Sequence, residues 1–90
     1  MSFEWDEEKH GNNLHKHGVD FIDAVKIFAQ PILEKPDHRE EYGEERVIAV
    51  GTFEHDYLVV VYTWRGEKRR IISAWKAGRD EKEAYHHSNP

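Results

Sequence analysis

Basic side chains gather in one short stretch of this acidic chain. The window 65–79 holds six cations and one carboxylate, Glu67, so it carries a net charge of +5, whereas the whole chain carries −5. Its cations are Arg65, Lys68, Arg69, Arg70, Lys76 and Arg79. Because phosphate groups respond to the local field, such a stretch can bind a polyanion on an otherwise acidic protein. The alternative interpretation is a solvated strand end whose charges discourage aggregation.

A second group of reactive side chains lies close to residue 17. Lys9, Asn13, Lys16 and His17 follow one another at three- to four-residue spacing, so they share one side of an expected helix. Imidazole ordinarily exchanges protons near neutral pH, and an ammonium group stabilises negative charge. The pattern predicts either the polar side of a binding site or a lightly packed surface helix, since only Leu14 is plainly apolar in this helix.

The acidic segment 36–45 holds adjacent carboxylates and an imidazole, which are chemically suitable for a metal ion. No recognised ligand spacing is present among Asp37, His38, Glu40 and Glu41. A solvated run of charge on a surface loop is therefore the favoured interpretation, and no metal or other cofactor is predicted.

Length and composition set the remaining bounds. Ninety residues with 38% apolar side chains predict one domain over 1–90 with one core. Cysteine is absent, so packing must stabilise the fold. The acidic start lacks the features of a secretory signal, and no apolar run is long enough to span a membrane. These features predict a cytoplasmic protein.

The apolar pattern predicts an α+β fold. A short edge strand at Phe3–Trp5 precedes a helix capped by Asp6 and ended by Gly18, and a second, conventional helix ends before Pro31. A brief strand follows at 32–35. Strands at 46–53, 58–64 and 68–76 then form an antiparallel meander, and a short charged helix completes the chain at 79–87. The expected order is β-α-α-β-β-β-β-α, with the helices on one face of the sheet.

Five segments between residue 3 and residue 74 form one ordered set of motifs. They are Phe-Glu-Trp-Asp-Glu-Glu-Lys at 3–9, Lys-His-Gly-Val at 16–19, Tyr-Gly-Glu-Glu-Arg at 42–46, Leu-Val-Val-Val-Tyr-Thr-Trp-Arg-Gly at 58–66 and Arg-Ile-Ile-Ser-Ala at 70–74. This set resembles the BrnT family of toxins from type II toxin–antitoxin modules. The resemblance implies a small fold similar to RelE and ParE toxins, with an antiparallel meander, two N-terminal helices on one face and a short C-terminal helix.

The resemblance also implies an activity. A BrnT-like toxin is expected to be a ribonuclease that cleaves RNA without a metal ion, inhibits translation and is neutralised by a BrnA-type antitoxin. That antitoxin binds DNA, so the toxin is expected to reach DNA only through its partner. The chemistry expected is attack by the RNA 2′-hydroxyl on its own phosphate, which requires a base, an acid and cations.

Within this activity, four residues are predicted to be catalytic. Arg70 and Arg46 are expected to clamp phosphate, because an arginine fork matches phosphate oxygens. Lys16 and His17 are expected to contribute a cation and a proton carrier. RNA contacts are expected from Arg65, Arg69, Trp75, Lys76 and Tyr85. Structural roles are the alternatives: Arg46 could pair with Glu44 or Glu45, His17 could cap its helix, and Tyr85 could pack the last helix on the sheet.

One residue departs from the pattern that the resemblance implies. The family is expected to carry an arginine at the position of Trp75. Tryptophan can stack on a base, worth about 1–3 kcal/mol, but it cannot stabilise a developing phosphate charge as a guanidinium does. Trp75 therefore favours an alternative function, a catalytically weakened protein that acts mainly as antitoxin-binding partner and co-repressor. A gyrase poison similar to ParE is a third hypothesis that depends on the fold alone.

Overall fold

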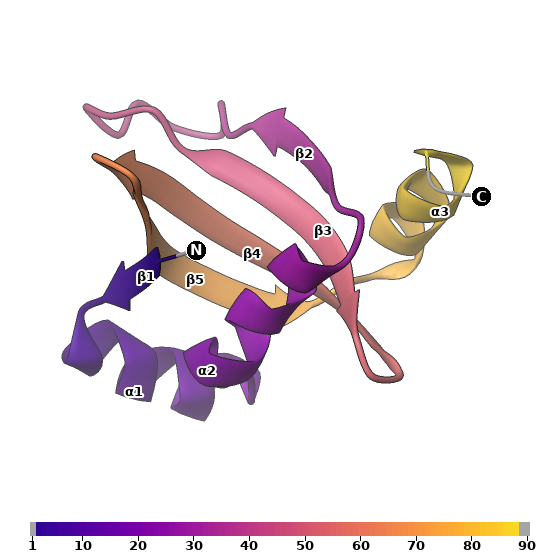
Figure 1. Cartoon of the computed structure of the whole chain (residues 1–90), viewed down its shortest axis with the longest axis horizontal. Helices are drawn as coiled ribbons and strands as arrows, with labels where there is room; N and C mark the ends of the chain where they lie inside the picture. The colour runs from indigo at the N-terminus through magenta and orange to yellow at the C-terminus, as the bar shows by residue number, and fades with distance from the viewer. Residues whose placement is uncertain (1, 89–90) are drawn as a thin grey trace.

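A computed structural model describes residues 2–88, which form a five-stranded sheet with three α-helices (Figure 1). The elements follow the predicted order. They are β1 (Ser2–Trp5), α1 (Glu7–His17), α2 (Phe21–Ala24), the 3₁₀ helix η1 (Val25–Ala29), β2 (Leu33–Pro36), β3 (Val47–Phe53), β4 (Asp56–Arg65), β5 (Lys68–Lys76) and α3 (Arg79–Ser88). The α+β class is confirmed. Within the described range 2–88, no helix has the length and apolar character needed to cross a membrane.

The predicted meander of β3, β4 and β5 is antiparallel, but the sheet as a whole is mixed. β2 to β5 pair antiparallel in sequence order, whereas β1 lies at the free edge of β5 and runs parallel to it, so that the sheet is mixed. Phe3 and Trp5 of β1 pack against the helix-side core. Residue periodicity identifies the face that a strand buries, but it does not specify the direction of a neighbouring strand.

The middle of β4 is buried on both faces, as its apolar run predicts. Leu58, Val60 and Tyr62 face the cluster that α1, α2 and η1 cover, and Val59 belongs to a second cluster on the opposite face. Each of these side chains is at most 3% exposed. Alternate side chains of a strand point to opposite faces, so β4 supports both layers of the protein.

The second helix is shorter than predicted. One turn of α-helix, α2, continues as the 3₁₀ helix η1. Val25 and Ile27 are β-branched and favour helix weakly, and this segment packs closely on β3. A Cβ built at Gly51 would lie only 2.8 Å from the Cβ of Ile27, so glycine permits this close approach.

α3 lies on the face of the sheet opposite to α1 and α2, contrary to the prediction that the helices share one face (Figure 1). Tyr85 is 6% exposed and packs with Val50, Val59 and Ala77. Its hydroxyl donates to the carbonyl of Pro31 at 2.7 Å. α3 contacts β2 and β3 on this second face, which we call the open face because α1, α2 and η1 cover the other one.

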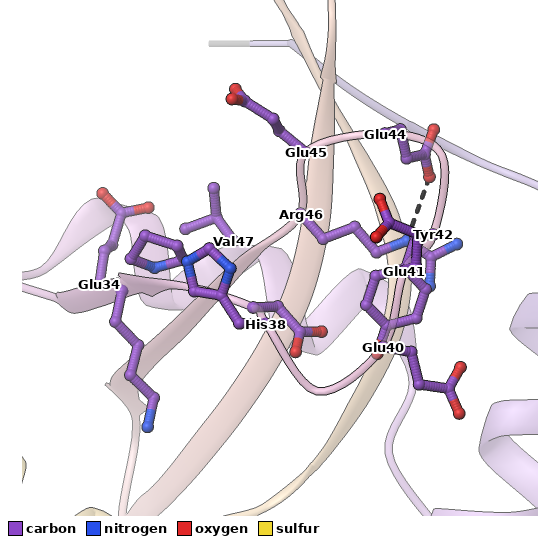
Figure 2. A pocket seen from close by; sticks show the side chains of 12 residues that line it. Glu34, His38, Glu40, Glu41, Tyr42, Glu44, Glu45, Arg46 and Val47 are labelled. Atoms are coloured by element: carbon purple, nitrogen blue, oxygen red, sulfur yellow. Dashed lines mark hydrogen bonds and ion pairs between the residues drawn. The ribbon is translucent and has the colours of Figure 1, made fainter.

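The β2–β3 loop encloses an acidic hollow of about 890 Å³ (Figure 2). Most of its charged lining is carboxylate: Glu34, Asp37, Glu40, Glu41, Glu44 and Glu45. No three His, Asp or Glu side chains among residues 2–88 are grouped so that they could hold a metal ion. An acidic wall repels phosphate, so this hollow is unsuited to a polyanion.

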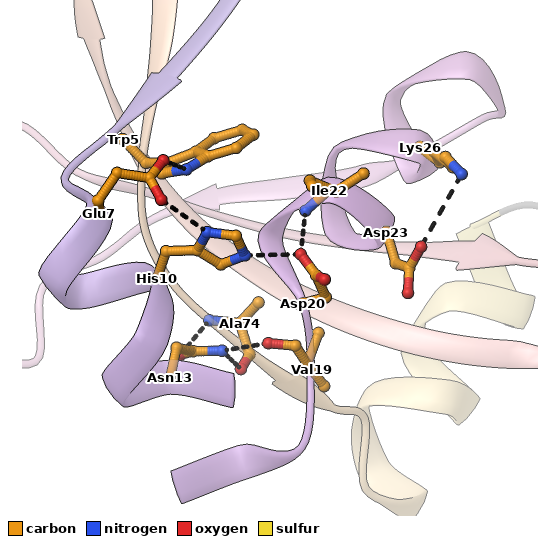
Figure 3. Close-up of polar contacts among 10 residues, drawn as sticks. All are labelled: Trp5, Glu7, His10, Asn13, Val19, Asp20, Ile22, Asp23, Lys26 and Ala74. Carbon is orange, nitrogen blue, oxygen red and sulfur yellow. Dashed lines mark hydrogen bonds and ion pairs between the residues drawn. The ribbon is translucent and has the colours of Figure 1, made fainter. Parts of the chain in front are cut away.

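His10 connects α1 to the start of α2 (Figure 3). Its Nε2 lies 2.6 Å from Asp20 Oδ1, and its Nδ1 lies 3.4 Å from Glu7 Oε2. The imidazole also stacks on Phe21, with ring centroids 5.3 Å apart. The hydrogen bond with Asp20 is the main cause that raises the pKa of His10, and Glu7 adds to the effect while burial opposes it.

This connection predicts a pH-dependent stability. Because the folded pKa of His10 is raised, its contribution is complete below the unfolded pKa of 6.5 and is lost as the pH rises through the folded pKa. Urea unfolding at about pH 6 and about pH 8 should therefore show a lower free energy of unfolding at the higher pH. The difference should shrink in His10→Gln and persist in His15→Gln, which changes an exposed histidine. An unchanged difference in His10→Gln would refute this role.

Candidate active site

A cationic hollow of about 730 Å³ opens beside the last turn of α1 and the end of β5. We call it the cationic hollow, and its lining residues are Lys16, His17, Arg39, Ser73, Trp75 and Lys76. Three of these six side chains are cations, and none is a carboxylate. The structure thus brings together four residues of the predicted site that lie far apart in the sequence, namely Lys16, His17, Trp75 and Lys76.

Asn13 fixes the position of α1 on the sheet. β1 pairs with β5 only as far as Ile71, which leaves the following backbone of β5 at an open edge. Asn13 Oδ1 accepts from the Ala74 N–H at 3.0 Å, and its Nδ2 donates to the carbonyls of Ala74 and Val19, each at 2.9 Å (Figure 3). The amide satisfies the edge as a neighbouring strand would, and it holds the last turn of α1 next to Trp75.

Removal of this amide should destabilise the protein. Asn13 is 6% exposed, so Asn13→Ala leaves backbone groups of Val19 and Ala74 buried without their partner. Three backbone groups lose their partner, each at a cost of about 1–3 kcal/mol, and we expect a loss of at least about 3 kcal/mol in the free energy of unfolding. Urea unfolding measures it, with the exposed neighbour Asn12→Ala as matched control. A loss no larger than the control's would show that Asn13 does not anchor α1.

Arg39 extends from the β2–β3 loop over Trp75 and was not among the predicted site residues. Its Nε and Nη2 donate to the two carboxylate oxygens of Asp37, each at 2.8 Å, and the guanidinium carbon lies 5.4 Å from the centre of the Trp75 ring. Arg39 lowers the pKa of the buried Asp37 to about 2, and Asp37 in turn raises the pKa of Arg39. The guanidinium is therefore a permanent charge in a fixed position.

Trp75 contacts His17 of α1 and Arg39 of the β2–β3 loop. Its ring lies 6.1 Å from the imidazole of His17, centroid to centroid, and it packs against the core cluster of the open sheet face. The Trp75 ring therefore offers an aromatic stacking surface next to an imidazole and a guanidinium.

Three further arginines lie outside the cationic hollow, at the other end of the sheet. Arg46 and Arg65 both contact Glu44 at 3.1 Å, and Arg70 lies 2.6 Å from Glu4. The register pairs Arg70 with Thr63, on the same sheet face as Val59 and Trp75. Arg70 precedes Lys76 by six residues, so the two Cα positions lie roughly 20 Å apart. The structural alternative for Arg46, pairing with Glu44, is the arrangement observed.

Two predicted RNA contacts lie inside the protein. Arg69 is 8% exposed and faces the helix side, where its guanidinium carbon lies 4.3 Å from the ring centre of Phe28, 5.1 Å from that of Tyr62 and 4.7 Å from that of Trp64. Tyr85 belongs to α3 and packs its side chain in the core cluster of the opposite face. These positions favour structural roles, and we do not include either residue in the site.

Comparisons with known proteins agree with the fold. The family model described as ribonuclease toxin, BrnT, of type II toxin-antitoxin system matches residues 5–81. The crystal structure of the Brucella abortus ribonuclease toxin BrnT aligns with a TM-score of 0.66 and 29% identity, over 88% of this chain and 99% of that chain. No curated protein sequence matches the chain significantly.

Together the matches indicate a small toxin of the type II toxin–antitoxin class. The chain belongs to the BrnT family of ribonuclease toxins, as its sequence motifs predict. Membership of a type II module also implies an antitoxin as its partner.

Proposed function

We propose that this protein is an endoribonuclease toxin that cleaves RNA in the cationic hollow without a metal ion. One observation carries the proposal: Lys16, His17 and Lys76 line one open hollow with Arg39, in a chain that belongs to a family of ribonuclease toxins. Cations and a proton carrier in one place are what phosphodiester cleavage by an internal hydroxyl requires.

The proposed reaction is transfer of the phosphate to its own ribose. His17 accepts the proton of the 2′-hydroxyl as that oxygen forms a bond to phosphorus. The bond from phosphorus to the 5′-oxygen of the next nucleotide breaks, and an ammonium group, that of Lys16 or Lys76, supplies a proton to the leaving oxygen. The products are a 2′,3′-cyclic phosphate and a 5′-hydroxyl. Both ammonium groups stabilise the extra charge of the transition state.

Arg39 supports activity despite the tryptophan at position 75. The resemblance leads to the expectation of an arginine there, and in this structure Arg39 extends a guanidinium over the Trp75 ring. Arg65 and Arg70 lie farther along the sheet, where we propose that they contact the phosphates of flanking nucleotides, whereas Arg46 lines the acidic hollow and is not included. Arg65 and Arg70 are each paired with a carboxylate, so RNA must displace Glu44 or Glu4 to reach them.

The cellular role follows from the family. We propose that cleavage takes place in the cytoplasm and inhibits translation, as for toxins with RelE-like folds, and that a BrnA-type antitoxin neutralises the protein. Such an antitoxin binds DNA, so the toxin contacts DNA only through its partner. Coverage of the cationic hollow by an acidic or amphipathic segment of the antitoxin would block RNA directly.

Induction of the wild-type chain alone in cells tests this proposal. We expect growth arrest together with new RNA ends, mapped by sequencing of 5′ termini. The second candidate function, a weakened toxin that serves mainly as antitoxin partner and co-repressor, is favoured by Trp75. It predicts normal growth and intact RNA while the complex with the antitoxin still forms, and that result would defeat the first proposal.

A further inference from the structure

A second hollow adjoins the cationic hollow on the open face of the sheet. Its volume is about 390 Å³, and we call it the apolar pocket. Half of its lining residues are aliphatic and come from three strands and from α3: Leu33, Ile48, Val50, Val59 and Ala84. Trp75 and Arg39 line both this pocket and the cationic hollow, so the two spaces meet at this pair of residues.

One space is cationic and the other is mainly apolar, which matches the phosphate and the base of a nucleotide. The cationic hollow suits a phosphate, and the apolar pocket, with an indole in its wall, suits a flat ring. Lys35, Asp80 and Glu81 add polar groups to the lining. Such groups can form hydrogen bonds with the donors and acceptors on the edge of a base. Arg39 is held at the junction by its two hydrogen bonds to Asp37.

We propose that the apolar pocket receives the nucleobase next to the phosphate bound in the cationic hollow, with Trp75 as its stacking surface and Arg39 at its entrance. This inference depends on the proposed function for the identity of the ligand. It assigns Trp75 to substrate binding and selection, and it makes the pocket a determinant of where the RNA is cut. A helix of the antitoxin is the competing occupant.

Ala84 allows a direct test, because it is exposed on α3 and lines the pocket. Ala84→Phe should fill the pocket without a change to the core. Glu83→Phe introduces the same side chain at the neighbouring exposed position, which does not line the pocket. The probes are a mixed-sequence DNA decamer and an abasic decamer of equal charge. Both lack the 2′-hydroxyl, so binding is measured apart from cleavage.

Wild type and Glu83→Phe should bind the abasic decamer at least about tenfold more weakly than the decamer with bases. In Ala84→Phe the ratio of the two dissociation constants should fall to about 1–2, with little change for the abasic decamer. An equal ratio in Ala84→Phe and wild type would overturn the proposal. The proposal would also be overturned if Ala84→Phe kept the base dependence but no longer bound the antitoxin, since the pocket would then be a site for that partner. If the wild type binds bases in this way but does not cleave RNA, the proposed function fails while the assignment of the pocket stands.

Discussion

Replacement of His17 by asparagine should lower the rate of RNA cleavage by about 10²–10⁴-fold, the usual contribution of a general acid or base. His17 is exposed in the cationic hollow, and its ring lies 6.1 Å from that of Trp75. Asparagine retains a polar side chain but cannot carry the 2′-hydroxyl proton. The loss should appear in the single-turnover rate with saturating protein, while RNA affinity changes little.

The matched control is His15→Asn, which removes an exposed imidazole two residues earlier on the same helix. This variant should cleave RNA at the wild-type rate, because His15 does not line the cationic hollow. Circular dichroism and urea unfolding should show that both variants are folded. Equal rates for His17→Asn and His15→Asn would exclude His17 as the proton carrier.

Replacement of Lys16 by glutamine should reduce cleavage by about 10²–10³-fold. Lys16 lines the cationic hollow together with the ammonium group of Lys76 and the guanidinium of Arg39. Glutamine keeps most of the length of the lysine side chain while it removes the charge. The loss should lie mainly in the rate of the chemical step, since the extra negative charge is greatest in the transition state.

Lys9→Gln supplies the comparison for Lys16, because Lys9 is exposed on the same helix and outside the cationic hollow. Both substitutions remove one positive charge, so any general electrostatic effect on RNA binding is shared. A similar decrease in both variants would mean that Lys16 acts through long-range attraction and not at the scissile phosphate.

The local parts of the fold were predictable because their signals lie close together in the sequence. Asp6 caps α1 through its side chain, Gly18 ends it in the left-handed conformation, and Gly66 supplies the positive φ between β4 and β5. The buried run of β4 is likewise apparent from its residue types. The direction of β1 and the face chosen by α3 depend on distant contacts, which no local pattern encodes.

The site was predictable in part for the same reason. Lys16 and His17 stand on a helix with few apolar residues, and the structure places them beside Trp75 and Lys76. The amide of Asn13 bonds to backbone 61 positions away, so the sequence shows a polar helix but not its anchor. Arg39 lies in an acidic loop whose charge suggested only a solvated surface. The two-residue spacing of Asp37 and Arg39 was the local sequence signal for this ion pair.

Arg69 shows the limit of reasoning from charge. The three consecutive cations from Lys68 to Arg70 alternate between the two faces of β5, and Arg69 turns into a cage of aromatic rings on the helix side. Arg70 faces the open side and meets Glu4 of β1. A basic segment in a strand therefore divides between two surfaces, and its net charge overstates the charge available to RNA.

The central claim is that the cationic hollow cleaves RNA by internal attack. Its most direct test is incubation of purified wild type and His17→Asn with a short single-stranded RNA in the presence of EDTA, followed by identification of the product ends. The account predicts that wild type yields 2′,3′-cyclic phosphate and 5′-hydroxyl ends, and that His17→Asn yields almost none. Intact RNA with wild type, cleavage that the chelator abolishes, or equal cleavage by both proteins would contradict it.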